Sequence, residues 1–588
     1  MALQQVTGAE PAPATRQRRA GGRSRSRAVE PFSVLLFGVL LVVFVALVVP
    51  PIFSLLRIAF TDSATGDLTT QNFRDIVPRL LRADLLANTF VFALSATTLS
   101  FVFGSLLAWF AERTNAPFRR LVYISAFTSF AFPTVIQVLG WIFLLGPRNG
   151  AINILLVDQL GILSKPFDVQ SMVGMILVES VLWTPIVFLL MVVPFRAMDA
   201  TLEEAGRAAG ASGPQVFSRI TLRLAVPAGL AVLLITVVRN LEAFEVPAML
   251  GLPGGVNVLT TEIFTRLKAT VVPNYGEVSA YSTLLILLVL PLLYGYYRAT
   301  KGQGKYATIT GKGMKSKRAD LGRYRWLAGL FMLTLPALVL APIIVLFWGS
   351  LLPFYRSPST GALAAASFDN YRELFAPDSQ VVSTMLTTAF VAMACATVVV
   401  LLTAAASWVI VRTRVPGRAA LDFVSVAPLA VPGIVLGVGV LWAYVGSPLP
   451  VYGTVAILVI AYLVRSIPYT MRFNHAGILG ISGELEESAL VAGATHRVML
   501  QRVLVPLLLP ALFTGWVYAF LMTARELPVA LLLQSSGNRM VSVTIWNLWE
   551  IGQVTKAAAL SVLVALVLTG LGWLLQFVSD RFGVATHQ

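Results

Sequence analysis

The chain has 588 residues, of which 57% are hydrophobic and 12% are charged, and its net charge is +16. Soluble domains carry about 25% charged residues, so this composition excludes an ordinary soluble fold and places most of the chain in lipid. The basic residues stand between apolar runs rather than on one face, which argues against a nucleic-acid partner.

Reactive side chains are few and scattered. The single cysteine, Cys395, lies inside an apolar run, so an intrachain disulfide is excluded. His475, His496 and His587 are far apart in the sequence, whereas a metal site needs clustered ligands. We therefore predict no bound metal.

In chain order, residues 1–30 come first; they are polar and contain six arginines. They predict a disordered basic arm in the cytoplasm. Further along, apolar runs of roughly 18 residues or more recur, each long enough to cross a hydrocarbon core about 30 Å thick. Lipid offers the backbone no hydrogen-bond partners, so such runs must be helical.

The apolar runs predict twelve helices in two sets of six. The first set covers 33–57, 88–111, 121–146, 171–195, 226–248 and 278–297, and the second covers 326–352, 383–411, 421–445, 451–471, 506–527 and 557–577. The expected fold is an all-α polytopic membrane protein of two homologous halves with about six transmembrane helices each. We place the halves at 31–297 and 326–577, with a basic linker at 298–325 and a short tail at 578–588.

An even number of spans puts both ends of the chain on one side of the membrane. With the ends inside, 29 Lys and Arg fall on the cytoplasmic side, 12 fall outside and three lie within predicted helices. Because cytoplasmic loops carry the excess of Lys and Arg, we predict cytoplasmic termini in a bacterial inner membrane.

An internal repeat supports the division into halves. The short basic turns RTNAPFR at 113–119 and RTRVPGR at 412–418 are offset by 299 residues, as are Pro133 and Pro432. The offset falls to 283 for Pro185 and Pro468. The sixteen extra residues of the first half therefore belong to its outer loop, where insertions are tolerated.

The clearest repeat lies between the fourth and fifth helix of each half, on the cytoplasmic side. Segments 202–228 and 485–511 are identical at ten of 27 positions without gaps. Each has an acidic pair and small residues, followed by a glycine, which predicts a short helix, a sharp turn and a return to the membrane. A single loop of this kind could be an ordinary interfacial helix with solvated carboxylates. Two copies at equivalent places, facing one compartment, favour a role in docking a partner. The predicted docking residues are Glu203, Glu204, Ala205, Gly210, Glu486, Glu487, Ala489 and Gly493.

These loops resemble the EAA motif of ABC-importer permeases, E-A-A-x3-G-x9-I-x-L-P. The first loop matches at Glu204, Ala205, Gly210, Ile220 and Leu222, and departs at Gly206 and Arg223. The second matches at Glu487, Ala489, Gly493 and Pro506, and departs at Ser488, Val503 and Val505. The segments EVPAMLGLPGGVNVLTTEIF and ELPVALLLQSSGNRMVSVTIW are, more weakly, similar to the ferric-iron type of permease.

The resemblance implies a fused, double-length permease of the type I fold that works by alternating access. Its implied partners are two ABC ATPase subunits, docked on the two loops, and an extracytoplasmic solute-binding protein. Ferric iron is the implied solute, with thiamine, a phosphonate or a polyamine as alternatives. The chain lacks a phosphate-binding P-loop, since Gly311-Lys312 is followed by Gly313 rather than Ser or Thr. We therefore predict a transport subunit without catalytic residues or a cofactor of its own, with ATP used by its partner.

Ionisable residues at membrane depth are costly and often mark a pathway. The candidates for a substrate path or gate are Glu179, Arg239, Glu242, Glu245, Arg525 and Glu526. The competing interpretations are interfacial charge pairs, such as Arg525 with Glu526, and a pair along one helix face between Arg239 and Glu242. Arg465 is set aside, because the predicted helix places it near the cytoplasmic end, where its side chain can reach the interface.

Two other classes compete with the permease interpretation. A twelve-helix secondary transporter shares the span count, but its repeated signature is expected between the second and third helices. A membrane enzyme would need a polar catalytic cluster in a large loop, and the loops here contain none.

Overall fold

The computed structural model describes residues 31–62, 65–82, 84–268, 274–300 and 318–581. Within them the chain is helical apart from turns, loops and two isolated β-bridges. Ten helices are long and apolar enough to cross a membrane, and two bent helix pairs raise the number to as many as twelve. This agrees with the predicted polytopic helical fold. The predicted N-terminal arm lies outside the described residues.

The first half runs from α1 to α12. Its helices are α1 (Pro31–Ala59), α2 (Gln71–Arg82), α3 (Leu85–Arg113), α4 (Arg119–Ala131), α5 (Thr134–Leu145), α6 (Ala151–Asn153), η1 (Ile154–Gln159), α7 (Met172–Ala197), α8 (Ala200–Ala208), α9 (Gly213–Val216), η2 (Phe217–Thr221), α10 (Leu222–Leu241), η3 (Pro247–Gly251), α11 (Leu259–Lys268) and α12 (Tyr275–Thr300).

The second half repeats this order. Its helices are η5 (Gly322–Tyr324), α13 (Arg325–Ser350), α14 (Thr360–Ala364), α15 (Asp369–Leu374), α16 (Val381–Arg412), α17 (Arg418–Val426), η6 (Ala427–Ala430), α18 (Gly433–Val445), α19 (Val455–Leu479), α20 (Gly483–Val491), α21 (His496–Met499), η7 (Leu500–Leu504), α22 (Val505–Ala524), α23 (Pro528–Leu533), α24 (Val541–Glu550) and α25 (Val554–Arg581). The π-turns η2 and η7 are offset by 283 residues, so the repeat extends to backbone detail.

The predicted single helices 121–146 and 421–445 are each broken in the structure. α4 meets α5 at 110°, and α17–η6 meets α18 at 112°. The breaks fall at Pro133 and Pro432, which have extended ψ angles of 137° and 149°. A proline disfavours helical geometry in the residue before it and donates no N–H, so hydropathy alone misses the break.

Two further helices end earlier than predicted. α10 ends at Leu241 rather than residue 248, and α22 ends at Ala524 rather than 527. Beyond these ends the chain forms short segments, η3 and α11 in one half and α23 and α24 in the other. Of these, α11 and α24 are anchored on the second long helix of their half, where Thr89 and Thr388 accept the N–H groups of Leu259 and Val541 at 3.0 and 2.9 Å.

The first long helix of each half packs on the opposite half. α1 lies against α16, α17 and α18, whereas α13 lies against α3, α4 and α5. Gly140 of α5 touches Pro342 of α13, and the equivalent Gly439 of α18 touches Pro51 of α1. In both places an added Cβ would lie 2.6 Å from the proline, so glycine is what allows the helices to meet.

The described parts of the predicted linker are ordered. Residues 298–300 complete α12, and the bridge between Thr114 and Ala319 joins the start of the second half to the basic turn of the first. Asn115 fixes this contact by donating to Asp320 at 2.6 Å and accepting from the N–H of Leu321 at 3.1 Å. Residues 301–317 lie outside the described part.

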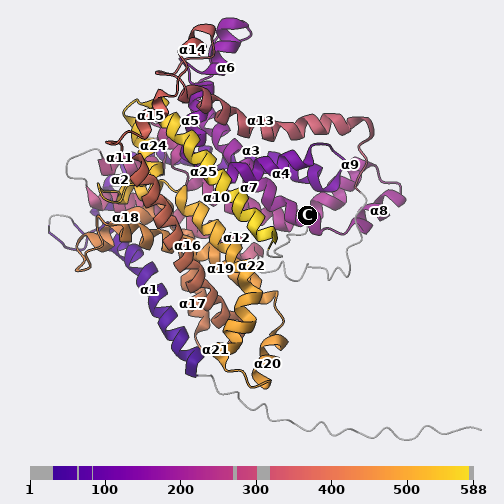
Figure 1. Cartoon of the computed structure of the whole chain (residues 1–588), viewed down its shortest axis with the longest axis vertical. Helices are drawn as coiled ribbons and strands as arrows, with labels where there is room; N and C mark the ends of the chain where they lie inside the picture. The colour runs from indigo at the N-terminus through magenta and orange to yellow at the C-terminus, as the bar shows by residue number, and fades with distance from the viewer. Residues whose placement is uncertain (1–30, 63–64, 83, 269–273, 301–317, 582–588) are drawn as a thin grey trace, which may run out of the picture.

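Figure 1 shows that α8 with α9 and α20 with α21 project from the molecule in two separate places, one in each half. In this view the starting end of α1 points to the same end of the molecule as α20 and α21, while α6 and α14 are seen at the opposite end. In this view both repeated loops lie away from α6, which belongs to the predicted outer loop of the first half.

Candidate functional site

The repeated loops form two equivalent short helices, α8 and α20. Their N-caps are Asp199 and Ser482, which accept the N–H groups of Thr201 at 2.9 Å and Glu484 at 3.4 Å. The hydrogen bonds from Thr201 hold the pKa of the Asp199 carboxyl below its usual value, because they favour the charged form. The Asp199 carboxylate therefore keeps its charge to a lower pH than an ordinary aspartate and loses it as the pH falls through the lowered pKa.

A glycine ends each helix. Gly210 and Gly493 have φ angles of +86° and +88°, in the left-handed region that side chains with a Cβ avoid. The N–H of the next residue then bonds back into the helix, from Ala211 to Gly206 at 3.0 Å and from Ala494 to Ala489 at 3.1 Å. This is the turn that the sequence predicted at both glycines.

The two acids of each pair point in opposite directions. Glu204 and Glu487 are exposed, whereas Glu203 and Glu486 are buried, with only 8% and 7% of their surface exposed. Among the small residues, Ala205 is exposed and Ala489 is half-buried. The sequence treated both acids of each pair as docking residues, but the buried carboxylates face the protein itself.

The buried acids are ion-paired with arginines of the second long helix. Arg113 lies 2.8 Å from Glu203, and Arg412 donates to Glu486 at 2.7 Å. These arginines were missed as site residues, although they begin the repeated basic turns. The repeat therefore marked both arginines in the sequence, but it did not indicate that their partners are Glu203 and Glu486.

At membrane depth the predicted pair of Arg239 with Glu242 is confirmed, with 2.7 Å between Nη1 and Oε2. Arg239 also lies over the ring of Tyr469, at 5.1 Å, and so contacts the second half. The suggested pair of Arg525 with Glu526 is wrong. Arg525 instead donates to the carbonyl of Phe130 and covers its ring, which is a contact between the halves.

Glu526 is paired with Arg465, the residue that the sequence had set aside. α19 continues to Leu479 rather than 471, so Arg465 lies fourteen residues from its cytoplasmic end, about 21 Å along a helix. It lies 3.7 Å from Glu526, which also accepts from the hydroxyl of Tyr462 at 3.2 Å. The sequence reasoning failed here because it ended the helix too early.

Besides Glu242, the first half presents Glu179 and Glu245 at this depth. Glu179 is buried and accepts the indole N–H of Trp183 at 2.9 Å, and within the described part of the chain it has no ion-pair partner. Glu245 lies close enough to Glu179, Arg465 and Arg525 for their charges to act on it. Of the predicted path residues, Arg239 and Arg525 thus make contacts across the boundary between the halves, with Tyr469 and Phe130. Among the described residues, no three metal-ligating His, Cys, Asp or Glu side chains gather at one place.

Comparison with known families identifies this architecture. The model of the binding-protein-dependent transport system inner membrane component matches the chain twice, over residues 100–300 and 399–584. The chain belongs to this family. It is a fused, double-length ABC-importer permease, since each half carries one copy of the family domain.

Several relatives span most of this permease. The ferric transport system permease protein FbpB of Actinobacillus pleuropneumoniae is 24% identical over 78% of this chain and 66% of its own length. A probable ABC transporter permease of Sinorhizobium fredii is 26% identical over 79% of this chain and 82% of its own. A putative 2-aminoethylphosphonate transport system permease protein of Salmonella typhimurium is 27% identical over 28% of this chain and 62% of its own.

The two halves of the permease carry different residues at the equivalent positions around Arg465. With the offset of 283 residues, Glu179 and Leu182 correspond to Tyr462 and Arg465. With the offset of 299, Thr134 corresponds to Gly433, where an added Cβ would lie 2.4 Å from Nη1 of Arg465. The second half thus carries an arginine together with the space that it needs, and the first half carries neither.

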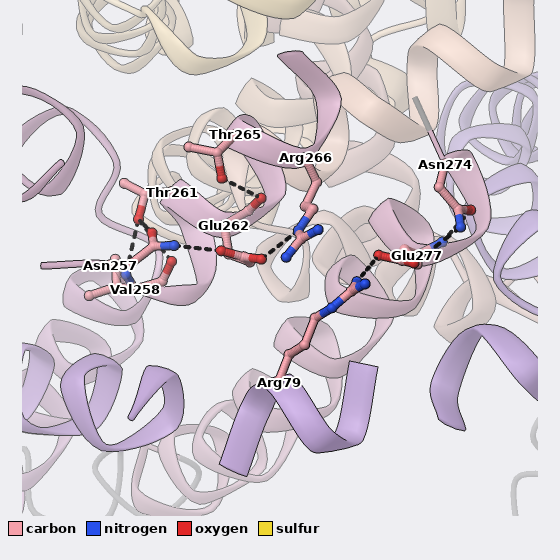
Figure 2. A network of polar contacts seen from close by, with 9 residues as sticks. All are labelled: Arg79, Asn257, Val258, Thr261, Glu262, Thr265, Arg266, Asn274 and Glu277. Atoms are coloured by element: carbon pink, nitrogen blue, oxygen red, sulfur yellow. Dashed lines mark hydrogen bonds and ion pairs between the residues drawn. The ribbon is translucent and has the colours of Figure 1, made fainter. Parts of the chain in front are cut away.

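A second polar network lies towards the outer ends of the first half and was not predicted. Figure 2 shows that Glu262 of α11 accepts from Asn257 and Arg266, at 2.5 and 2.7 Å. Glu277 of α12 accepts from Arg79 of α2 and from Asn274. Both acids fell in a predicted outer loop, so their burial gave no signal in the sequence. α11 and α24 are offset by 282 residues, and Glu262 corresponds to Thr544, so this network too is confined to one half.

Proposed function

We propose that this permease is the membrane subunit of an ATP-driven importer, with one ATPase subunit docked on α8 and one on α20. An extracytoplasmic binding protein delivers the solute to the opposite side, and the permease itself holds no ATP. The observation that carries this proposal is the pair of equivalent loops, which project separately from the two halves (Figure 1). Two equivalent docking points suit two ATPase subunits acting on one fused chain.

The exposed residues of the loops supply the docking surface. Glu204, Glu487 and Ala205 are exposed, so a partner can contact them directly. Gly210 and Gly493 leave open space around their backbone, with nothing within 4 Å of an added Cβ. A partner surface can therefore approach the turn closely.

Ferric iron is the proposed solute, because two relatives that span most of the chain carry ferric transport in their names. The match to a 2-aminoethylphosphonate permease supports a phosphonate as the second candidate, although it covers only 28% of the chain. Thiamine and polyamines are weaker candidates that rest on family resemblance alone. We place the path between the halves, along Glu179, Arg239, Glu242, Glu245, Arg525 and Glu526, and we add Arg465.

Co-purification tests the importer. The chain is affinity-purified from its own host in mild detergent, and its partners are identified by mass spectrometry with ATPase activity assayed on the same sample. We expect a stoichiometric ATPase, two copies for each permease, which the paired variant Glu204→Lys, Glu487→Lys loses. A chain that purifies without ATPase and transports on an ion gradient in proteoliposomes would instead be a secondary carrier.

Uptake in whole cells tests the solute. We expect cells lacking the permease to lose binding-protein-dependent accumulation of radioactive ferric iron and to keep uptake of 2-aminoethylphosphonate. Glu179→Gln should lower iron uptake without lowering the amount of ATPase that co-purifies. The reverse pattern of uptake would assign the permease to phosphonates.

A further inference from the structure

The ion pairs of the two repeated loops, Arg113 with Glu203 and Arg412 with Glu486, each lie where three helices meet. Each such meeting point is called a joint below. Arg113 is the last residue of α3; it reaches Glu203 on α8 and donates to the carbonyl of Met198, the C-cap of α7, at 3.3 Å. One guanidinium thus connects the ends of two membrane helices with the helix that faces the cytoplasm.

The second half builds the same joint from equivalent residues. Arg412 ends α16, donates to Glu486 on α20 at 2.7 Å, and donates to the carbonyl of Ile478 on α19 at 2.9 Å. It also donates to the carbonyl of Ile481, just beyond that helix. The two arginines are 299 residues apart and the two glutamates 283, which are the offsets of the repeat itself.

The membrane helices of each joint pack closely. Gly104 of α3 lies against Val187 and Phe188 of α7, where an added Cβ would lie 2.7 Å from Val187. α16 and α19 are also in contact along their length in the second half, where Thr403 stands at the position of Gly104. Because the arginine is fixed at the ends of two packed helices, a displacement of α8 or α20 must displace both.

The ion pair of the first joint is buried, whereas Arg412 in the second joint is half-buried. Arg113 is only 5% exposed, and Glu203, besides its ion pair with Arg113, accepts a hydrogen bond from the hydroxyl of Thr221 at 2.7 Å. A guanidinium offers several N–H groups in a rigid planar fork, so it can hold a carboxylate and a carbonyl in one geometry. A lysine ammonium is a single point on a flexible stem and lacks this property.

We propose that Arg113 and Arg412 are positioning residues that make each ATPase-facing helix move as one body with the membrane helices of its half. The proposal rests on the proposed function, because the movement it transmits is the movement of docked ATPase subunits. Glu203 and Glu486 are the receiving ends of the joint, whereas the adjacent Glu204 and Glu487 serve docking. Neighbouring acids of one helix therefore have separable roles.

Spin labels test the joint without any partner. Leu202 on α8 and Val491 on α20 are exposed and are replaced by labelled cysteines one at a time, while the native Cys395 is buried. We expect Arg113→Gln and Glu203→Gln to raise label mobility at 202 equally, and their combination to add no more. Arg412→Gln and Glu486→Gln should act alike at 491. Glu204→Gln is the matched control and should leave mobility at 202 unchanged; equal mobility in all variants would overturn the proposal.

Coupling in the complete complex gives the second measurement. The permease is reconstituted with its co-purified ATPase and binding protein, and solute uptake is divided by ATP hydrolysed. We expect Glu203→Gln and Glu486→Gln to retain the ATPase but to lower this ratio several-fold, and Arg113→Lys and Arg412→Lys to give intermediate ratios in a monodisperse complex. An unchanged ratio would overturn the proposal. If the unmodified chain binds no ATPase, the proposed function fails, while label mobility still decides whether the joint exists.

Discussion

At the residue scale, the ion pair between Arg465 and Glu526 depends on one glycine, Gly433. Arg465 fits beside α18 because Gly433 has no side chain, and it neutralises Glu526 from there. Removing one partner of a buried pair leaves an uncompensated charge, which is strongly destabilising. The first half has Leu182 and Thr134 at the equivalent positions, so this ion pair has no counterpart there.

We therefore expect Gly433→Ala to destabilise the permease by displacing Arg465 from Glu526. In an Arg465→Leu, Glu526→Leu background the same glycine substitution should cost little, because no guanidinium needs the space. The difference between the two backgrounds should be on the order of 1 kcal/mol, as for other residues in contact. Heat-challenge size-exclusion profiles of the four proteins measure it, and equal losses in both backgrounds would show that the glycine serves only packing.

At the element scale, short breaks place the functional segments. Gly210 and Gly493 turn the chain after α8 and α20, and Pro133 and Pro432 break the third span of each half. Nothing lies within 4 Å of a Cβ added at either glycine, so conformation alone restricts these positions. A residue other than glycine in left-handed geometry costs roughly 1–2 kcal/mol.

This predicts an order of effects at Gly210 and Gly493. Asparagine should retain most of the co-purifying ATPase, alanine should retain less, and valine least, because asparagine tolerates the left-handed region and a β-branched residue does not. Gly213 is the matched control, since it also has open space around it but lacks a positive φ. If Gly213→Ala reduced ATPase binding as much as Gly210→Ala, the turn conformation would not be the cause.

At the scale of the whole molecule, each half is completed by a helix from the other. α1 and α13 cross to the opposite half and meet it at Gly439 and Gly140. At Gly140 an added Cβ would lie 2.7 Å from the carbonyl oxygen of Pro342, so backbone would have to move. Overpacking of this kind typically costs about 1–3 kcal/mol.

We expect the halves to remain associated after the chain is cut at a protease site inserted within 301–317. Gly140→Ala with Gly439→Ala should let the cut halves separate at a lower temperature. Gly38→Ala is the control, because nothing lies near that glycine of α1 and alanine favours a helix by about 1 kcal/mol. Co-elution of the halves after heating measures the effect; separation unaffected by the paired substitution would place the main contact elsewhere.

Local patterns in the sequence were sufficient to predict the class of protein, its two repeated domains and the short helix and glycine turn of each repeated loop. Hydropathy and the excess of basic residues are properties of short segments, and the repeat offsets come from comparing the sequence with itself. All three can therefore be obtained without knowing which segments pack together. The left-handed turns at Gly210 and Gly493 were predictable for the same reason, since glycine itself carries the signal.

Tertiary structure alone decided the partners of the charged residues. It buried Glu203 beside Arg113 and left Glu204 exposed, although the two acids are adjacent in sequence. It also brought Arg465 to Glu526 and crossed α1 and α13 between the halves. The physical reason is that such contacts depend on how helices distant in sequence pack and on where each helix ends. A difference of a few residues in the end of a helix decides whether a charged side chain lies at the interface or deep in the membrane.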